Sequence, residues 1–230
     1  MIKRVHFPDP CSPLLDDIVL ADDRIDTNIL LEAYSHGIFP WPHDEYPLLW
    51  FCPSHRGILR FENLHVSKSL YKFVEKTRER YTYKLDNDFS GVVEACSKAP
   101  RKGQLGTWIN DHLKPHYMGL NKKGYAHSVE VYENNNLVGG LYGVFVNGVF
   151  SGESMFHLQD NVSKLALLKT VYWLKGLGMD WMDVQMVTPL LKAFGASYVK
   201  KLDYFKLLRA TQKKNVQFKP LVFSHQIEET

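Results

Sequence analysis

Three polar side chains on two predicted strands have the types and spacing to act on one reacting group: Glu153, Asp183 and Gln185. Residues 181–187 alternate between apolar and polar types, which predicts a strand that carries Asp183 and Gln185 on one face. Residues two apart on a strand are separated by roughly 7 Å, so a carboxylate and an amide there could address the same group. The same pattern is typical of solvent-facing polar residues on a half-buried strand, and spacing alone leaves both interpretations open.

The strand that carries Glu153 belongs to a predicted hairpin. Asn147-Gly148 separates two runs rich in valine, tyrosine and phenylalanine, and this dipeptide favours a two-residue type I′ turn. Counted outward from that turn, Tyr142 should face Glu153, unless a bulge shifts the register. The hairpin also contains several glycines, which favour close approach by a ligand or by another backbone. They are Gly139, Gly140, Gly143 and Gly152.

Capping residues and hydrophobic periodicity predict the helices around these strands. A helix over 27–36 has Asp26 as its N-cap and ends at Gly37, where a left-handed residue is favoured. Further helices are predicted from Ser67, over 89–97 behind Asp88, and between the hairpin and strand 181–187. Helices that alternate with a run of antiparallel strands predict an α+β domain.

Composition sets limits on the class of protein. The chain has 230 residues, 45% of them hydrophobic, which is long enough for one large domain or two small ones. No apolar run has the length of a membrane span and the N-terminal residues lack a signal peptide, so we expect a cytoplasmic protein without a membrane partner. Cys11, Cys52 and Cys96 are widely spaced, and the histidines form no H-x-x-x-H or comparable ligand pair on a convincing helix. Neither a disulfide framework nor a metal site is therefore predicted.

Basic residues recur on the helix that begins at Ser67. Lys68, Lys72 and Lys76 are four residues apart and form one stripe, and Arg80 and Lys84 continue it nearby. The net charge of +3 is too balanced to indicate nucleic-acid binding, so such a function would depend on local clusters of this kind. A solvated helix face is the more usual interpretation of a lysine stripe.

A set of collinear motifs covers most of the chain. They are Y-S-H-G-I-F-P-W (34–41), L-W-F-C-P (49–53), G-T-W-I (106–109), F-S-G-E-S-M-F (150–156), N-V-S-K (161–164), D-V-Q (183–185) and F-G-A (194–196). In this order the motifs resemble those of the leucyl/phenylalanyl-tRNA–protein transferases, from about residue 25 to residue 208.

The resemblance implies a fold and a reaction. It implies a small irregular N-terminal domain over 1–62 and a GNAT-like acyltransferase domain over 63–230 with a mainly antiparallel sheet. It implies transfer of Leu or Phe, with Met as a further donor, from aminoacyl-tRNA to the N-terminal Lys or Arg of a protein, which is thereby marked for N-end-rule degradation. No cofactor is expected, and a monomer is expected because no long amphipathic seam is spare.

The resemblance also implies roles for particular residues. Asp183 with Gln185 would receive or orient the attacking amine, and Glu153 would attract the free amino group of the donor. Trp50 and Trp108 would stack on the terminal adenosine, although packing in a core explains a tryptophan equally well. The basic stripe would contact tRNA phosphates. Candidates for the pocket that admits the donor side chain are Leu141, Gly152, Met155, Leu167, Thr170 and Met182.

Two other functions are compatible with parts of the sequence. A GNAT-type acetyltransferase would need a glycine-bearing loop to hold the pyrophosphate of acetyl-CoA, and residues 157–163 contain no glycine. A non-catalytic RNA-binding protein is suggested by three departures from the family pattern. Thr188, Leu190 and Ala193 stand where the family has Asn, His and Ser.

Overall fold

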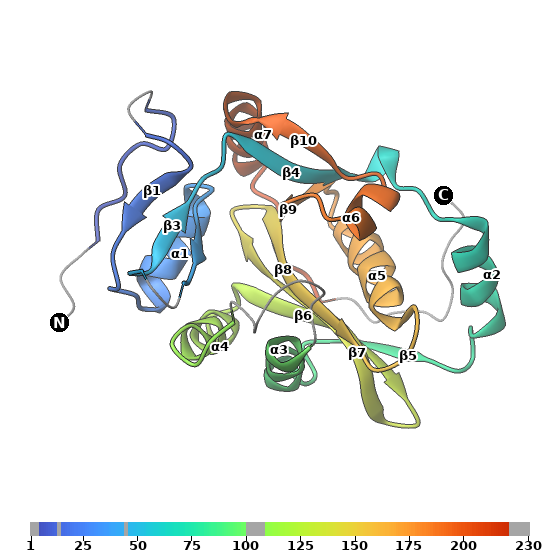
Figure 1. The fold of residues 1–230 in the computed structure, drawn as a ribbon. Coiled ribbons are helices and arrows are strands. Elements are labelled where there is room, and N and C mark those ends of the chain that lie inside the picture. The colour runs from blue at the N-terminus through green and yellow to red at the C-terminus, as the bar shows by residue number, and fades with distance from the viewer. Residues whose placement is uncertain (1–4, 13–14, 44–45, 100–108, 221–230) are drawn as a thin grey trace.

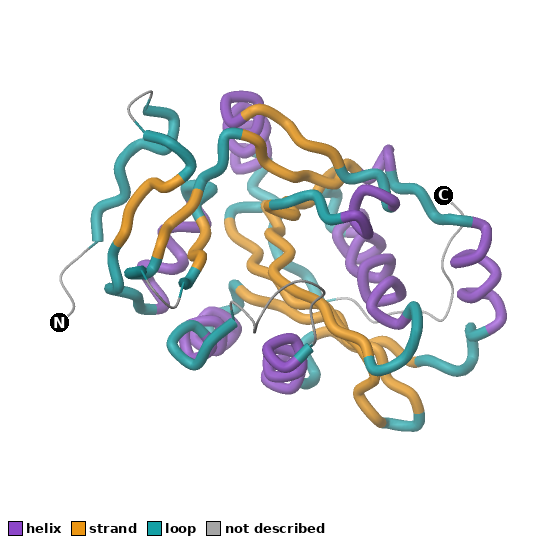
Figure 2. The backbone as a smooth tube through the Cα atoms, viewed as in Figure 1, coloured by secondary structure: helices purple, strands orange, loops and turns teal. Residues whose placement is uncertain are grey.

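The computed structural model describes residues 5–12, 15–43, 46–99 and 109–220 of the chain. It contains two β-sheets, a small one near the N-terminus and a larger one that the remaining helices surround (Figures 1 and 2). The larger sheet is mainly antiparallel, so the α+β class predicted from the sequence is confirmed.

The small sheet has the order β1-β3-β2, with strands Ile18–Ala21, Leu49–Phe51 and Phe39–Trp41, all antiparallel. Helix α1 (Thr27–Ser35) packs beside it. The Asp26 side chain accepts hydrogen bonds from the backbone N–H groups of Asn28 and Ile29, and Gly37 follows the helix with φ +70°. Both predicted ends of this helix are confirmed.

The large sheet has the order β10-β4-β9-β8-β7-β6-β5. Its strands are β4 (His55–Arg60), β5 (Thr82–Leu85), β6 (Ala126–Glu133), β7 (Asn136–Val146), β8 (Val149–His157), β9 (Trp181–Gln185) and β10 (Ser197–Lys200). The other helices are α2 (Lys68–Lys76), α3 (Phe89–Lys98), α4 (Lys114–Lys122), α5 (Val162–Gly176), α6 (Pro189–Ala193) and α7 (Lys201–Lys213), with the 3₁₀ turn η1 (Phe61–Asn63) after β4.

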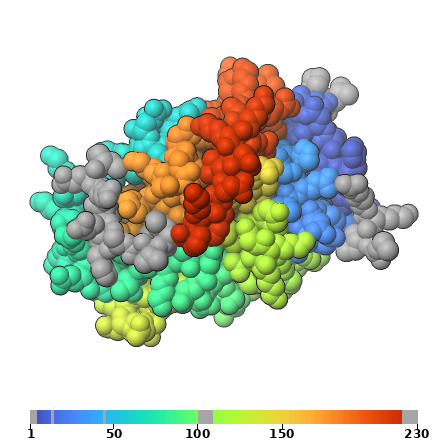
Figure 3. All heavy atoms as spheres, turned by 180° about the vertical axis from the view of Figure 1, so that it is seen from behind, coloured from blue at the N-terminus to red at the C-terminus, as the bar shows by residue number. Residues whose placement is uncertain are grey.

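Two apolar cores lie on the two faces of the large sheet. One joins side chains of α1, α3, α4 and α7 with those of the small sheet. The other is built around α5, which is buried along most of its length, and also includes side chains of α2. Figure 3, which views the molecule from behind, shows α7 and the residues after it lying between α5 and the N-terminal part of the chain. Phe218, which follows α7, covers part of the second core by packing against Trp173, with ring centroids 5.8 Å apart.

One pair of neighbouring strands in the large sheet is parallel. Strand β8 leads through α5 to β9, and the two strands share a single register pair, Ser151 with Asp183. A crossover helix is the usual connection between parallel neighbours. Because the strands pair only at this point, the sheet opens between their following residues, and side chains there can line a cavity.

The hairpin of β7 and β8 has the predicted turn but a different register beyond it. Asn147 and Gly148 have φ values of 51° and 78°, as a type I′ turn requires. A bulge then pairs Tyr142 with Ser154, so the expectation that Tyr142 faces Glu153 is wrong. Glu153 is the extra residue of the bulge, and bulges of this kind redirect a side chain.

Strand β4 lies before the expected domain boundary after residue 62, yet it pairs with β9 and β10 of the large sheet. We therefore propose that the boundary between the two parts of the chain lies just before β4.

Within the described residues, no helix has the length and hydropathy to span a bilayer.

Candidate active site

A pocket of about 270 Å³ opens where β8 and β9 diverge. Its walls are mostly apolar, and Glu153 and Gln185 supply its polar side. Strand β8 contributes Gly152, Glu153, Ser154 and Met155; β9 and the residues after it contribute Met182, Val184, Gln185, Met186, Thr188 and Leu191; and the remaining wall consists of Trp41, Leu141 and Leu167. The pocket therefore suits an apolar side chain attached to a polar group.

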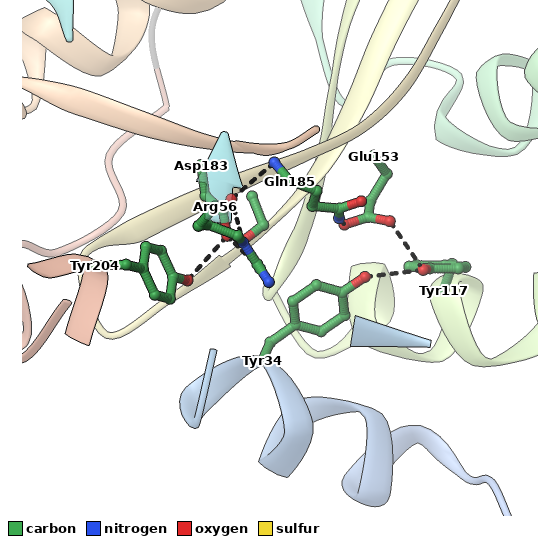
Figure 4. Close-up of polar contacts among 8 residues, drawn as sticks. Tyr34, Arg56, Tyr117, Glu153, Asp183, Gln185 and Tyr204 are labelled. Carbon is green, nitrogen blue, oxygen red and sulfur yellow. Dashed lines mark hydrogen bonds and ion pairs between the residues drawn. The ribbon is translucent and has the colours of Figure 1, made fainter. Parts of the chain in front are cut away.

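The Glu153 carboxylate is held by hydrogen bonds at both oxygens. Gln185 donates from Nε2 to Oε1 over 2.6 Å, and the Tyr117 hydroxyl donates to Oε2 over 3.1 Å. The hydroxyls of Tyr117 and Tyr34 are 2.9 Å apart, which extends the chain of polar groups to α1 (Figure 4). Burial raises the pKa of Glu153 to about 7, and hydrogen bonds from the two tyrosines only partly offset that rise.

The Asp183 carboxylate is fully buried beside β4. Arg56 donates to it twice, from Nε to Oδ1 over 2.9 Å and from Nη2 to Oδ2 over 2.6 Å. Tyr204 and Ser151 donate from their hydroxyls to Oδ2 over 3.0 and 3.3 Å. Arg56 is itself buried, with its guanidinium over the rings of Phe39 and Tyr204. The alternative that Asp183 is a solvent-facing polar residue is wrong.

Gln185 connects the two carboxylates through its backbone and its side chain. Its N–H donates to Asp183 Oδ1 over 2.9 Å, while its amide group reaches Glu153. Its φ is +59°, and the N–H of Met186 donates to the carbonyl of Val184 over 2.6 Å. This is the rarer and more strained form of the γ-turn, which tends to occur where a site needs a particular geometry. The turn directs Gln185 into the pocket, so the simple alternation expected for residues 181–187 fails at this point.

The chain matches two family models. The model described as "Leucyl/phenylalanyl-tRNA protein transferase" matches residues 58–209, and the model of the N-terminal domain of the same family matches residues 23–54. The chain belongs to this family. The resemblance stated from the motifs is confirmed.

Curated relatives agree with this assignment over most of their length. A leucyl/phenylalanyl-tRNA–protein transferase of Pseudoalteromonas atlantica is 40% identical over 213 residues, 92% of this chain and 90% of that protein. The transferase of Pseudoalteromonas translucida is 43% identical and covers 80% of this chain and 76% of that protein. The transferase of Shewanella pealeana is 38% identical and covers 88% of this chain and 85% of that protein.

A comparison of solved structures adds little to this family assignment. A protein of Staphylococcus epidermidis described as functionally unknown has a TM-score of 0.39 and 11% identity, covering 78% of this chain and 66% of that chain. This likeness is too weak to decide the fold.

The structure brings together most of the residues that the transferase motifs indicate for the donor pocket. Leu141, Gly152, Met155, Leu167 and Met182 all line it. Thr170 is absent from the walls: it is buried in α5, where its hydroxyl donates to the carbonyl of Ala166 over 2.8 Å.

Of the two tryptophans named from the sequence, only Trp50 is among the described residues, and it does not line the pocket. Trp50 is fully buried in the small sheet, where it packs edge-on against Phe7 and donates from Nε1 to the carbonyl of Asp22 over 3.2 Å. Trp108 lies outside the described residues. Trp41 lines the pocket instead. Trp41 belongs to the motif at 34–41, so the sequence does contain a signal for it. Only tertiary packing shows that Trp50 is buried whereas Trp41 lines the pocket.

Two of the three departures from the family pattern, Thr188 and Ala193, are exposed, whereas Leu190 is partly buried against the second core. The basic stripe divides in a similar way. Lys68, Lys72 and Lys76 are exposed on α2, whereas Arg80 donates to Glu133 over 2.6 Å and Lys84 lies 4.8 Å above the ring of Tyr132. Thr188, at the position of the family's Asn, lines the pocket. Its side chain accepts the Leu191 N–H over 3.2 Å and so caps α6.

Proposed function

We propose that this protein transfers Leu or Phe, and also Met, from aminoacyl-tRNA to the α-amino group of a protein that begins with Lys or Arg. The observation that carries the proposal is the pocket between β8 and β9. Its walls are apolar and rich in methionine on one side, and they end at the linked Glu153 and Gln185 on the other. An aminoacyl ester has the matching arrangement, with an apolar side chain beside an amino group.

In this proposal the donor enters the pocket with its side chain among the apolar walls. Met155 and Met182 adapt to both leucine and phenylalanine because the methionine side chain is unbranched and flexible. The free amino group of the donor lies near Glu153, which attracts it as a carboxylate. Gly152 keeps this part of the wall free of a side chain.

Asp183 acts in the proposal by positioning other groups. Its carboxylate already accepts hydrogen bonds from Arg56, Tyr204, Ser151 and the N–H of Gln185. Gln185, held in its strained turn by Asp183, orients the attacking amine at the edge of the pocket. The ester is already activated, so holding the two substrates in place can supply much of the reduction in the barrier.

Two further elements would contact the tRNA. Trp41 lines the pocket and is the better candidate than Trp50 for stacking on the terminal adenosine, since Trp50 is buried. Stacking of a base on an aromatic ring is worth about 1–3 kcal/mol. The stripe of Lys68, Lys72 and Lys76 is exposed and would neutralise phosphates without selecting a sequence.

The fold and the setting complete the proposal. A parallel pair of strands that diverges around a pocket, within an otherwise antiparallel sheet, supports a GNAT-like fold for the larger part of the chain. The protein would act as a cytoplasmic monomer, and its products would be substrates of N-end-rule degradation.

The test of this function is a transfer assay. Incubation with radiolabelled Leu-tRNA or Phe-tRNA and an Arg-initiated protein should place label in the polypeptide. A parallel incubation with labelled acetyl-CoA should give none. Binding of tRNA without transfer would favour a non-catalytic RNA-binding protein, and acetyl transfer would favour an acetyltransferase.

Replacement of Lys68, Lys72 and Lys76 together by glutamine should weaken tRNA binding and flatten its salt dependence. Each lysine that neutralises a phosphate should account for about 0.7–0.9 of the slope of log K against log salt, and its removal should reduce the slope by that amount. Filter binding at several salt concentrations measures both quantities. The matched control replaces Lys122, Lys200 and Lys213, which are also exposed. Equal effects of the two triple variants would indicate that the stripe is an ordinary solvated helix face.

A further inference from the structure

Transfer to an amine requires a group that takes a proton. An α-amino group has a pKa of about 7.7–8.0, and after it attacks the ester carbon it carries a proton that must leave. Such a group has to be within hydrogen-bond reach of the reacting atoms, directly or through one water. Among the described residues that line the pocket, Glu153 is the one side chain that titrates between an acid and its conjugate base near neutral pH.

Asp183 is the other carboxylate near the site, and its surroundings leave it no access to the substrate. It is fully buried and does not line the pocket. Its Oδ1 accepts hydrogen bonds from Arg56 and from the N–H of Gln185. Its Oδ2 accepts hydrogen bonds from Arg56 and from the hydroxyls of Tyr204 and Ser151. A carboxylate with all these donors has no lone pair directed at the pocket, and it serves to fix its neighbours.

We infer that Glu153 accepts the proton of the attacking α-amino group, and that Asp183 contributes only through the position of Gln185. This inference rests on the proposed transfer function. It adds a second role to the attraction between Glu153 and the amino group of the donor.

The proton and electron balance of the step is simple. The nitrogen lone pair of the acceptor attacks the ester carbon, the C–N bond forms, and the carbonyl electrons move to oxygen. Glu153 takes one proton from the new ammonium nitrogen. When the carbonyl re-forms, the C–O bond to the terminal ribose breaks, and the ribose oxygen leaves with the proton that Glu153 returns. The donor ester and the acceptor amine supply every atom of the two products.

The surroundings of Glu153 suit this exchange. Burial raises its pKa to about 7, a value at which a carboxylate both takes and returns a proton near neutral pH. The titratable and charged groups that face it are Tyr34 from α1, Tyr117 from α4, Asp183 from β9 and Arg56 from β4. The two tyrosines and Arg56 lower its pKa, and Asp183 raises it.

The two roles of Glu153 are separated by a donor that lacks the α-amino group. Glu153→Gln keeps the shape of the side chain but removes its charge and its basicity. If Glu153 only attracts the donor's amino group, the variant should transfer 3-phenylpropionyl from its tRNA ester as fast as wild type does. If Glu153 takes the proton, transfer of both phenylalanyl and 3-phenylpropionyl should fall by about 10²–10⁴-fold.

The experiment measures single-turnover transfer of these two groups to an Arg-initiated peptide. Wild type must transfer phenylalanyl, and failure there would remove the proposed function and not this inference alone. Glu62→Gln, on an exposed residue of η1, is the matched control and should transfer both groups at the wild-type rate. A thermal unfolding curve for each variant separates a defect in chemistry from a defect in folding. Wild-type transfer of 3-phenylpropionyl by Glu153→Gln would overturn the inference.

A second variant tests the same step without removing the carboxylate. Tyr117→Phe deletes the hydroxyl that donates to Glu153, so the ionised carboxylate loses a stabilising partner and its pKa should rise. Because Glu153 must be ionised to act as the base, the transfer rate rises with pH through its pKa. In the variant this rising part of the pH–rate profile should shift to higher pH by about one unit. The part of the profile that reports ionisation of the peptide amine should not shift. An unmoved profile in Tyr117→Phe, with a normal rate at high pH, would contradict Glu153 as the proton acceptor.

Discussion

Asp183→Ala is expected to lower the free energy of unfolding by about 3–5 kcal/mol and to stop aminoacyl transfer. The loss is large because Arg56 is only 1% exposed and would be left as a buried charge without its partner. Tyr204 and Ser151 would also lose their acceptor. Urea unfolding measures the first effect, and the transfer assay at a temperature where the variant is folded measures the second.

A double variant distinguishes a stabilising role of Asp183 from its proposed role in positioning Gln185. Arg56→Met with Asp183→Leu removes both buried charges, and such replacements are often neutral or stabilising. The double variant should therefore recover much of the stability that Asp183→Ala removes. Transfer should stay low, because the Gln185 N–H still lacks its carboxylate acceptor. Recovery of both stability and transfer would show that Asp183 contributes to folding alone.

Gly152→Val is expected to lower transfer of Leu and Phe by about 10²-fold while the protein remains folded. A Cβ at this position would meet the Cε atom of Met182 at 2.9 Å and the carbonyl oxygen of Asp183 at 3.7 Å. The end of a methionine can move, so the fold should tolerate the change. The added methyl groups would occupy the wall of the pocket proposed for the donor side chain, and would displace the ester from its attacking partner.

Two matched variants and an unfolding curve complete this experiment. Gly152→Ala adds less volume and should cause a smaller loss, greater for Phe than for Leu. Gly176→Ala, where a Cβ meets nothing within 4 Å, should leave transfer unchanged. Wild-type rates in a folded Gly152→Val protein would mean that the donor side chain lies elsewhere.

Features that depend on a few neighbouring residues could be predicted from the sequence. The Asn147-Gly148 turn, the caps at Asp26 and Asp88, and the helix behind Ser67 all follow from local backbone preferences, and the structure contains each of them. The motifs also identified the family, because several short segments in a fixed order carry far more information than any single one.

The geometry of the site could not be predicted, because it depends on contacts between distant parts of the chain. A Cβ at Gly143 would lie 2.4 Å from the carbonyl oxygen of Ser151, so the bulge depends on close approach of two backbones. The positive φ of Gln185 likewise breaks the alternation that a strand pattern predicts. Sequence spacing gives no sign that Arg56 meets Asp183, or that Tyr34 meets Tyr117 across 83 residues.

The intact mass of an Arg-initiated peptide after incubation with Phe-tRNA and this protein tests the central claim most directly. The proposed transfer predicts a product heavier by one phenylalanine residue, with the addition at the N-terminus in its fragmentation spectrum. The same peptide with an acetylated N-terminus should remain unchanged, because it lacks the attacking amine. An unchanged mass of the free peptide, or addition to the acetylated one, would contradict the account.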